Sequence, residues 1–219
     1  MNVLILGATG MVGQGVLREC LLDGGVTRVV TLGRTPIGQS HPKLDDVIHR
    51  DLLHLEPVEN QLRDLDACFY CLGASAAGSS EAEYTRINYD ITLAVAETLV
   101  RLDPDMTFVY VSGAGTDSTE RGRTMWARVK GRTENALLRL PFRAAYMLRP
   151  GVIIPMHGVR SKTRLYRIFY ALLGPVLPTL KKIFPRSVIT TEQFGRAMLR
   201  LARSGYSKHV LEMSDLASL

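Results

Sequence analysis

The segment "NVLILGATGMVG", at the start of the sequence, constrains the fold more than any other stretch. An apolar run at residues 3–6 predicts a short buried strand over residues 2–6, and apolar residues at helical spacing follow the glycines. Gly7 permits a tight turn, Gly10 lets phosphates approach the backbone, and Gly13 lets the helix pack closely on the strand. The segment therefore predicts a strand, loop and helix that hold a pyrophosphate at the helix N-terminus.

Strand-like and helix-like segments alternate along most of the chain. We expect further strands at 26–34, 45–52, 66–73, 106–115 and 143–151, and helices at 55–65, 79–104 and 120–140. This alternation predicts an α/β fold with a doubly wound parallel sheet, a Rossmann fold, in one domain of 219 residues.

The rhythm changes after Gly151. Residues 1–151 are expected to form the dinucleotide-binding core, and the proline-rich, basic residues 152–190 a small C-terminal substrate lid. Residues 191–219 would close the fold with a helix, begun by a capping box from Thr190 to Gln193, and a strand at 208–213.

The end of the second strand bears on the choice of nucleotide. NAD-specific folds usually place an acidic residue there, whereas this chain reads "TLGRT" with Arg34. A guanidinium suits a 2′-phosphate, so we expect NADP(H) to be preferred over NAD(H). The alternative is a surface arginine near a turn. Asp51 and Leu52 end the third strand, where adenine would lie.

The charge of +6 is unevenly distributed, because residues 1–110 carry −7 and residues 111–219 carry +13. A basic surface for anionic ligands, two faces that meet in a homodimer, or a simply solvated face would each account for it. Residues 160–186 contain no acid and could contact an anionic membrane surface weakly, although we favour a role as a cap over the substrate pocket. No nucleic-acid-binding motif accompanies them.

The three cysteines make an odd number, which suits a reducing compartment better than a disulfide framework. With no signal peptide at the start of the sequence, we expect a cytoplasmic protein. Cys68 and Cys71 fall on one predicted strand and point to opposite faces, so we expect no metal or redox site there.

Seven short segments together resemble a known superfamily. They are "GATGMVGQGVL", "GRT", "RDL", "CLGAS", "VYVSGAG", "RVKGRTE" and "LRPG". In this order they are similar to the short-chain dehydrogenase/reductase superfamily, in its atypical, epimerase-like NAD(P)-binding branch, and to the small Tat-interacting-protein oxidoreductases within it. The resemblance implies NADP(H) binding and the reduction or epimerisation of a small carbonyl compound.

The resemblance also implies roles for individual residues. Ser112 would hydrogen-bond the substrate carbonyl, Lys130 would hold the nicotinamide ribose, and Arg149 to Gly151 would close the nicotinamide pocket. The expected cofactor-binding residues are Gly7, Thr9, Gly10, Met11, Val12, Gly13, Arg34, Asp51, Leu52, Leu72, Gly73, Ala74, Lys130, Pro150, Gly151 and Val152.

The chain departs from the superfamily at Trp126, which stands four residues before Lys130 in the place of the usual tyrosine. An indole N–H can hydrogen-bond an oxyanion but does not supply a proton. Another group, His157 or Tyr84, could replace the missing acid. Water or Ser112 could also relay the proton, or the protein could bind NADP(H) without turnover, as a sensor or scaffold. The candidate catalytic residues are therefore Ser112, Lys130, Trp126 and His157.

Overall fold

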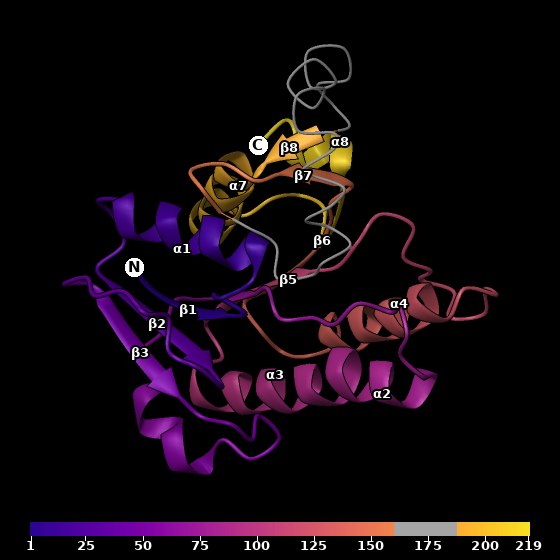
Figure 1. Ribbon diagram of the computed structural model, residues 1–219, viewed down its shortest axis with the longest axis horizontal. Helices are drawn as coiled ribbons and strands as arrows, with labels where there is room; N and C mark the ends of the chain where they lie inside the picture. Colours follow the sequence, from indigo (N-terminus) through magenta and orange to yellow (C-terminus); the bar gives the residue numbers. More distant parts are fainter. Residues whose placement is uncertain (160–187) are drawn as a thin grey trace.

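The computed structural model describes residues 1–159 and 188–219. Within these residues, seven strands form one parallel sheet in the order β3-β2-β1-β4-β5-β6-β9 (Figure 1). The strands are β1 (Asn2–Leu6), β2 (Arg28–Gly33), β3 (Leu44–Ile48), β4 (Ala67–Tyr70), β5 (Thr107–Val111), β6 (Ala144–Arg149) and β9 (Val210–Glu212). The doubly wound Rossmann fold expected from the sequence is confirmed.

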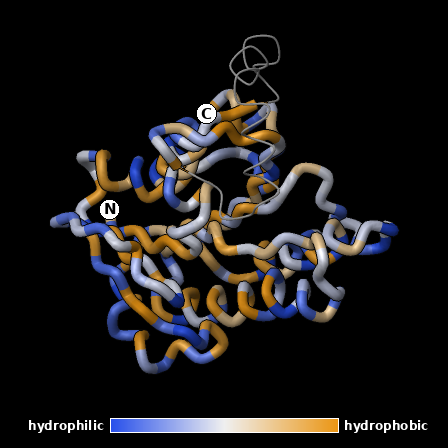
Figure 2. Tube along the Cα trace, viewed as in Figure 1, coloured by the Kyte–Doolittle hydropathy of each residue, from blue (hydrophilic) through white to orange (hydrophobic). Residues whose placement is uncertain are grey.

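Helices cover both faces of the sheet (Figure 1). One face carries α1 (Met11–Leu22), α7 (Thr191–Ser204) and the short α8 (Met213–Leu216). The other carries the 3₁₀ turn η1 (Glu56–Gln61), α2 (Glu81–Thr85), the π-helical turn η2 (Arg86–Asp90), α3 (Ile91–Leu102) and α4 (Met125–Leu137). Successive strand residues serve the two layers: Val3 and Ile5 pack on the side of α1 and α7, Leu4 and Leu6 on the side of α3. Figure 2 shows these apolar strands at the centre of the molecule.

β1 is the strand at which the order of strand addition reverses, because β2 and β3 lie on one side of it and β4, β5, β6 and β9 on the other. It pairs with β2 on one side and with β4 on the other, and Leu6 at its end lies opposite Leu32 and Tyr70. The connections that leave β1 and β4 therefore diverge to opposite faces. Open α/β sheets bind ligands in the crevice at such a switch point, at the carboxyl ends of the strands.

The predicted helix at 79–104 is not one continuous α-helix, because the π-helical turn η2 separates α2 from α3. Asn88 in this turn is buried, and its backbone carbonyl accepts hydrogen bonds of 3.0 Å from the hydroxyls of Thr92 and Thr133. The turn thus ties the helix to α4. Apolar residues four apart continue through it, so their spacing gave no sign of the interruption.

The predicted helix at 120–140 begins only at Met125. The preceding loop is held by the Asp117 carboxylate, which accepts hydrogen bonds from the amides of Thr119 and Gly122, and Glu120 has a φ of 61°. A left-handed residue does not continue an α-helix.

Two short strands border the predicted lid. β7 (Val152–Ile154) and β8 (Val188–Thr190) pair in parallel, and the capping box from Thr190 to Gln193 begins α7 as predicted. Apart from residues 155–159, the rest of the predicted lid lies outside the described residues. The same holds for residues 160–186, for which a membrane contact is the less favoured alternative. No helix in the described ranges is long and apolar enough to cross a membrane.

Candidate functional site

The carboxyl ends of the strands open into a cleft of about 970 Å³. It is lined by most of the residues predicted to bind the cofactor or act in catalysis. These are Gly7, Thr9, Gly10, Met11, Val12, Arg34, Leu52, Leu72, Gly73, Ala74, Ser112, Lys130, Pro150 and Gly151. The predicted residues outside the lining are Gly13, Asp51, Trp126, Val152 and His157.

The glycine loop forms the middle of the cleft. Gly7 has a φ of 77°, and a Cβ there would lie 2.6 Å from the carbonyl carbon of Cys71. A Cβ on Gly13 would lie 2.2 Å from the Gly7 oxygen, so Gly13 supports the loop from behind instead of lining the cleft. No side chain caps the N-terminus of α1 and its first turn has no acid. The loop and helix end therefore form a backbone cradle suited to an anion.

Two arginines stand at the end of the cleft formed by β2 and β3. Arg34 follows β2 and Arg50 follows β3, and neither guanidinium has a hydrogen-bond or ion-pair partner among the described residues. The nearby Asp46 carboxylate accepts hydrogen bonds from the Thr31 hydroxyl at 2.7 Å and the Ile37 amide at 2.8 Å. Within the part of the chain that the structure describes, this end of the cleft thus offers two unpaired guanidiniums, while the Asp46 carboxylate is already hydrogen-bonded.

Arg50 is a cleft residue that the sequence reasoning missed. The sequence feature that could have indicated Arg50 is its place next to Asp51, after the third predicted strand. Neighbouring parallel strands end at the same edge of a sheet, so Arg50 is expected close to Arg34. Asp51 itself is turned away. Its carboxylate contacts the His54 ring at 2.9 Å and accepts from the Leu53 amide, which fixes the turn after β3.

At the opposite end, Ser112 follows β5 and is almost fully buried. Its hydroxyl lies 3.0 Å from that of Thr116, which donates to the Gly113 carbonyl at 2.8 Å. Because the Thr116 hydrogen is used in that bond, Ser112 is the donor toward Thr116. The oxygen of Ser112 therefore presents lone pairs, not a hydrogen, to the cleft.

Lys130 on α4 reaches the same end of the cleft. Its ammonium donates to the Tyr110 hydroxyl and to the Val111 carbonyl, each at 3.2 Å, and lies 4.8 Å from the centre of the Tyr110 ring. Burial lowers the pKa of Lys130 to about 8, although the nearby Glu134 carboxylate acts in the opposite direction. Desolvation thus brings this amine close to the titration range of physiological pH.

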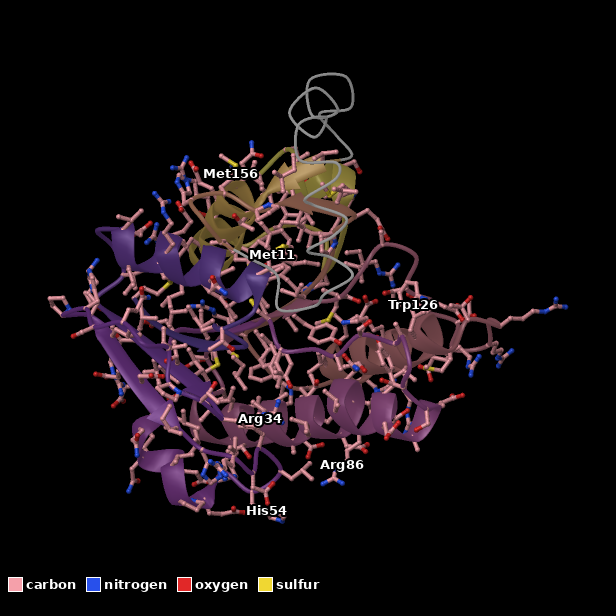
Figure 3. All side chains as sticks on the ribbon, in the orientation of Figure 1. Met11, Arg34, His54, Arg86, Trp126 and Met156 are labelled. Atoms are coloured by element: carbon pink, nitrogen blue, oxygen red, sulfur yellow. The ribbon has the colours of Figure 1, made fainter. Side chains whose placement is uncertain are left out.

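Trp126 lies near the start of α4 (Figure 3), one helical turn before Lys130, and is not among the residues that line the cleft. Its six-membered ring packs beside the turn at Gly113 and Gly115. A Cβ added to Gly113 would lie 3.9 Å from Cζ3 of Trp126, and one added to Gly115 would lie 3.6 Å from Cη2. The indole thus covers a backbone segment that has no side chains at these two positions, and the predicted alignment of residues 126 and 130 on one helix face is consistent with this placement.

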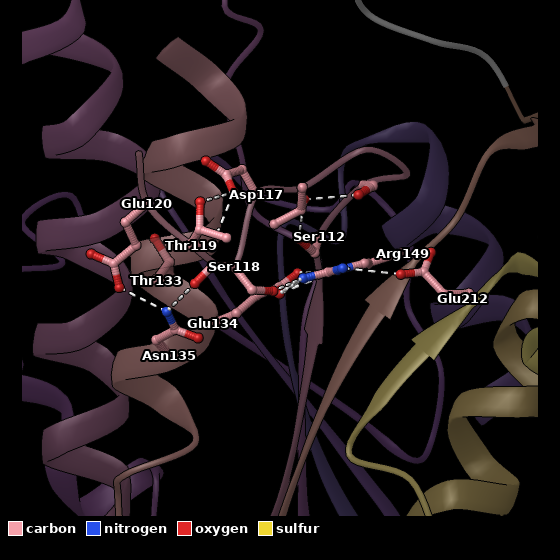
Figure 4. Close-up of polar contacts among 12 residues, drawn as sticks. Ser112, Asp117, Ser118, Thr119, Glu120, Thr133, Glu134, Asn135, Arg149 and Glu212 are labelled. Carbon is pink, nitrogen blue, oxygen red and sulfur yellow. Dashed lines mark hydrogen bonds and ion pairs between the residues drawn. The ribbon is translucent and has the colours of Figure 1, made fainter. Parts of the chain in front are cut away.

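Arg149 does not close the pocket with its side chain (Figure 4). The guanidinium donates to the fully buried Glu134 carboxylate at 2.5 Å, to the Ser118 hydroxyl at 2.5 Å and to Glu212 at 3.0 Å. This ion-pair cluster joins β6, α4 and β9. The neighbouring Pro150 and Gly151 line the cleft as expected.

The other predicted proton donors lie away from the cleft. His157 has a φ of 55° and its Nε2 lies 2.9 Å from a Glu192 carboxylate oxygen on α7. Tyr84 is buried on α2 and is not part of the lining. Val152 is replaced in the lining by Ile153, because successive residues of β7 point to opposite sides.

The cysteines are unpaired. Burial raises the pKa of Cys71, which lines the cleft, to about 12, and it also raises the pKa values of Cys20 and Cys68. Across residues 1–159 and 188–219, no group of three or more His, Cys, Asp or Glu side chains could hold a metal ion.

The parallel sheet, the glycine loop before α1 and the cleft at the switch point define a dinucleotide-binding protein of the short-chain dehydrogenase/reductase type. The chain belongs to the NAD dependent epimerase/dehydratase family, whose sequence model matches residues 3–123. It is 31% identical over 191 residues to the mitochondrial protein fmp52 of Emericella nidulans, covering 82% of this chain and 79% of that protein. The family assignment makes a nicotinamide dinucleotide the cofactor class of this cleft.

Solved structures share the fold at low sequence identity. An oxidoreductase of the short-chain dehydrogenase/reductase family from Burkholderia thailandensis superposes with a TM-score of 0.69 at 18% identity, over 100% of this chain and 93% of that one. The dTDP-glucose 4,6-dehydratase DesIV of Streptomyces venezuelae, a double mutant solved with NAD, gives 0.72 at 16% identity, over 97% and 75%.

The expected cytoplasmic location is corrected by these relatives. The protein from Emericella nidulans and further fungal relatives are named as mitochondrial. Unpaired cysteines fit any reducing compartment, so an odd cysteine count could not single out the cytoplasm.

Proposed function

We propose that this protein is an NADP(H)-dependent oxidoreductase or epimerase-like enzyme that acts on a small carbonyl compound. The observation that carries the proposal is the distribution of groups along one cleft. A backbone cradle lies in the middle, the guanidiniums of Arg34 and Arg50, which have no partner among the described residues, lie at one end, and Ser112 and Lys130 lie at the other.

The residues present fit a reduced dinucleotide. The amides at the start of α1 would hold the pyrophosphate, and Arg34 and Arg50 would bind the adenosine 2′-phosphate. Leu72 to Ala74 would contact the nicotinamide ribose; Asn88 positions this segment by accepting a hydrogen bond of 3.3 Å from the Ala74 amide. When bound, the cofactor would supply a hydride to a substrate carbonyl.

The second candidate is a protein that binds NADP(H) without turnover, as a sensor or scaffold. It is favoured by Trp126, because the residue that provides the proton in related enzymes is absent from its usual position. The two candidates make the same prediction for binding and opposite predictions for chemistry.

The single tryptophan of the chain makes binding measurable. Trp126 lies at the proposed nicotinamide end, and reduced nicotinamides absorb where tryptophan emits. NADPH should therefore quench Trp126 and give sensitised nicotinamide emission, whereas 2′,5′-ADP, which lacks nicotinamide, should bind without sensitised emission. Trp126→Phe removes the signal and is the control.

Turnover is tested by NADPH oxidation with benzaldehyde, cyclohexanone, cyclohexenone and menadione. Binding with oxidation of NADPH supports the enzyme. Binding without oxidation by any of the four selects the sensor or scaffold, and absence of binding to NADPH and NADH rejects both candidates.

A further inference from the structure

The cleft contains few groups that can exchange a proton near neutral pH. Its ionisable lining residues, among those that the structure describes, are Arg34, Asp46, Arg50, Cys71 and Lys130. The first three lie at the β2 and β3 end, and burial raises the pKa of the Cys71 thiol to about 12, too high for it to exchange a proton near neutral pH. Only Lys130 is located beside Ser112, since its ammonium contacts the carbonyl of the preceding residue, Val111.

The lysine is held from below by a tyrosine that belongs to the sheet. Tyr110 on β5 is fully buried, does not line the cleft, and accepts a hydrogen bond of 3.2 Å from the Lys130 ammonium. A tyrosine–lysine pair is therefore present, but with its order reversed: the amine faces the cleft and the phenol lies beneath it. Burial raises the pKa of Tyr110 well above its ordinary value, so the phenol stays neutral.

The hydrogens at this end are also accounted for. The Lys130 ammonium has three, and the Tyr110 hydroxyl and Val111 carbonyl accept two of them. The Ser112 hydrogen is directed to Thr116. The third hydrogen of Lys130 is thus the donor left for a substrate oxygen.

We propose that the Lys130 ammonium is the proton donor of the reaction, in place of the absent tyrosine, and that Tyr110 positions it. The inference rests on the proposed function. As the carbonyl carbon receives the hydride, the C=O π electrons move onto oxygen, and that oxygen takes a proton from Nζ of Lys130. The N–H bond breaks, leaving a neutral amine that solvent water reprotonates. The residue at 126 then needs no acidic hydrogen and can be an apolar contact for the glycine turn.

The acidity of Lys130 suits this step. A general acid works best when its pKa is close to the working pH. The pKa of an ordinary lysine, about 10.4, lies more than two pH units above pH 8, so an ordinary lysine is too weak an acid. Burial corrects this by penalising the charged form. The neutral amine left after transfer is also the form that the desolvated site favours.

The first test needs no cofactor. Lysine amines are reductively methylated with an isotope-labelled methyl donor, and the Lys130 signal, assigned by its loss in Lys130→Ala, is titrated by NMR. The midpoint should lie near pH 8 in the wild type and at lower pH in Tyr110→Phe, which removes an acceptor from the ammonium. A midpoint near that of an exposed lysine, or one unchanged in Tyr110→Phe, would overturn the proposal.

The second test uses the carbonyl compound in the four-member panel that is reduced fastest. Wild-type kcat should fall about tenfold for each pH unit above 8, and Lys130→Ala should lose at least about 100-fold while NADPH binding changes less than about tenfold. Added methylamine should raise the kcat of Lys130→Ala at least tenfold, and added guanidinium should not. Lys208→Ala, at a surface lysine paired with Asp215, is the control and should behave as wild type.

The outcomes separate the two claims. If wild type reduces a panel member and Lys130→Ala keeps its rate, shows no amine rescue, or the wild-type rate is flat through pH 8, the proton-donor role is wrong and the oxidoreductase stands. If wild type binds NADPH and reduces nothing, both are wrong. If Lys130→Ala does not fold, Lys130→Arg replaces it. This variant keeps the positive charge but does not release its proton, so it should be equally inactive.

Discussion

The two arginines at the β2 and β3 end of the cleft allow a quantitative prediction. Arg34 and Arg50 lie on neighbouring strand ends, have no partner among residues 1–159 and 188–219, and border the same cleft. A hydrogen bond to a charged group contributes about 1.5–3 kcal/mol, and solvent screening places these two at the lower limit. Each arginine is therefore expected to contribute about 1.4 kcal/mol, a factor of about ten in Kd.

Replacing either arginine with alanine should weaken NADPH binding about tenfold, and replacing both about 100-fold. NADH lacks the 2′-phosphate, so its Kd should change less than about twofold. Quenching of Trp126 measures both constants, and the NADPH effect should shrink at high salt. Arg63→Ala, at an exposed arginine outside the cleft, matches the charge change and should leave both constants unaltered.

Equal losses for NADPH and NADH would show that the arginines act on a part common to both nucleotides. Unchanged NADPH binding in the double variant would refute the 2′-phosphate assignment altogether. An effect confined to Arg34 would leave the nucleotide preference in place and remove Arg50 from it.

Three further predictions concern stability and the glycine loop. Gly13→Ala places a Cβ 2.2 Å from the Gly7 oxygen, so it should abolish dinucleotide binding and cost about 1–3 kcal/mol in chemical denaturation, whereas Gly24→Ala, with nothing within 4 Å, should be neutral or slightly stabilising. Lys130→Met removes a desolvated ammonium and should stabilise the protein by about 1–2 kcal/mol at pH 7 in chemical denaturation. Because the pKa of Lys130 is lower in the folded than in the unfolded state, this gain should decline as the pH rises from 8 towards 10.5. A loss of stability in the variant would contradict the burial argument. Glu134→Ala leaves the Arg149 guanidinium without its buried partner and should cost about 3–5 kcal/mol, while Lys208→Ala at an exposed pair should cost less than about 1 kcal/mol.

Much of the fold follows from local sequence features. The glycines after residues 2–6, the alternation of strand and helix, and the Thr190 capping box are short-range signals that no distant contact overrides. The strand order then follows from the general behaviour of parallel sheets. The interruption at η2 could not be foreseen, because the buried Asn88 carbonyl is satisfied by Thr133, a residue on another helix.

The candidate site was predictable where it is made of backbone and only partly where it depends on side-chain direction. Arg34 and Lys130 line the cleft, but Arg149 turns to Glu134 and His157 to Glu192, because each finds a carboxylate that lies far away in the sequence. The pairing of Lys130 with Tyr110 joins a helix to a strand 20 residues earlier. Spacing within one helix could not indicate it.

The pairing of β7 with β8 has a consequence for how this protein can diversify. These strands bring Val152 beside Val188 and Ile154 beside Thr190, so the two ends of the stretch between them, Ile154 and Val188, lie on neighbouring strands and only two residues out of register. Insertions or deletions between such closed ends cost little, since the entropy of a loop grows slowly with its length. The length and sequence of residues 155–187 can therefore change during evolution at little cost to the pairing of β7 with β8.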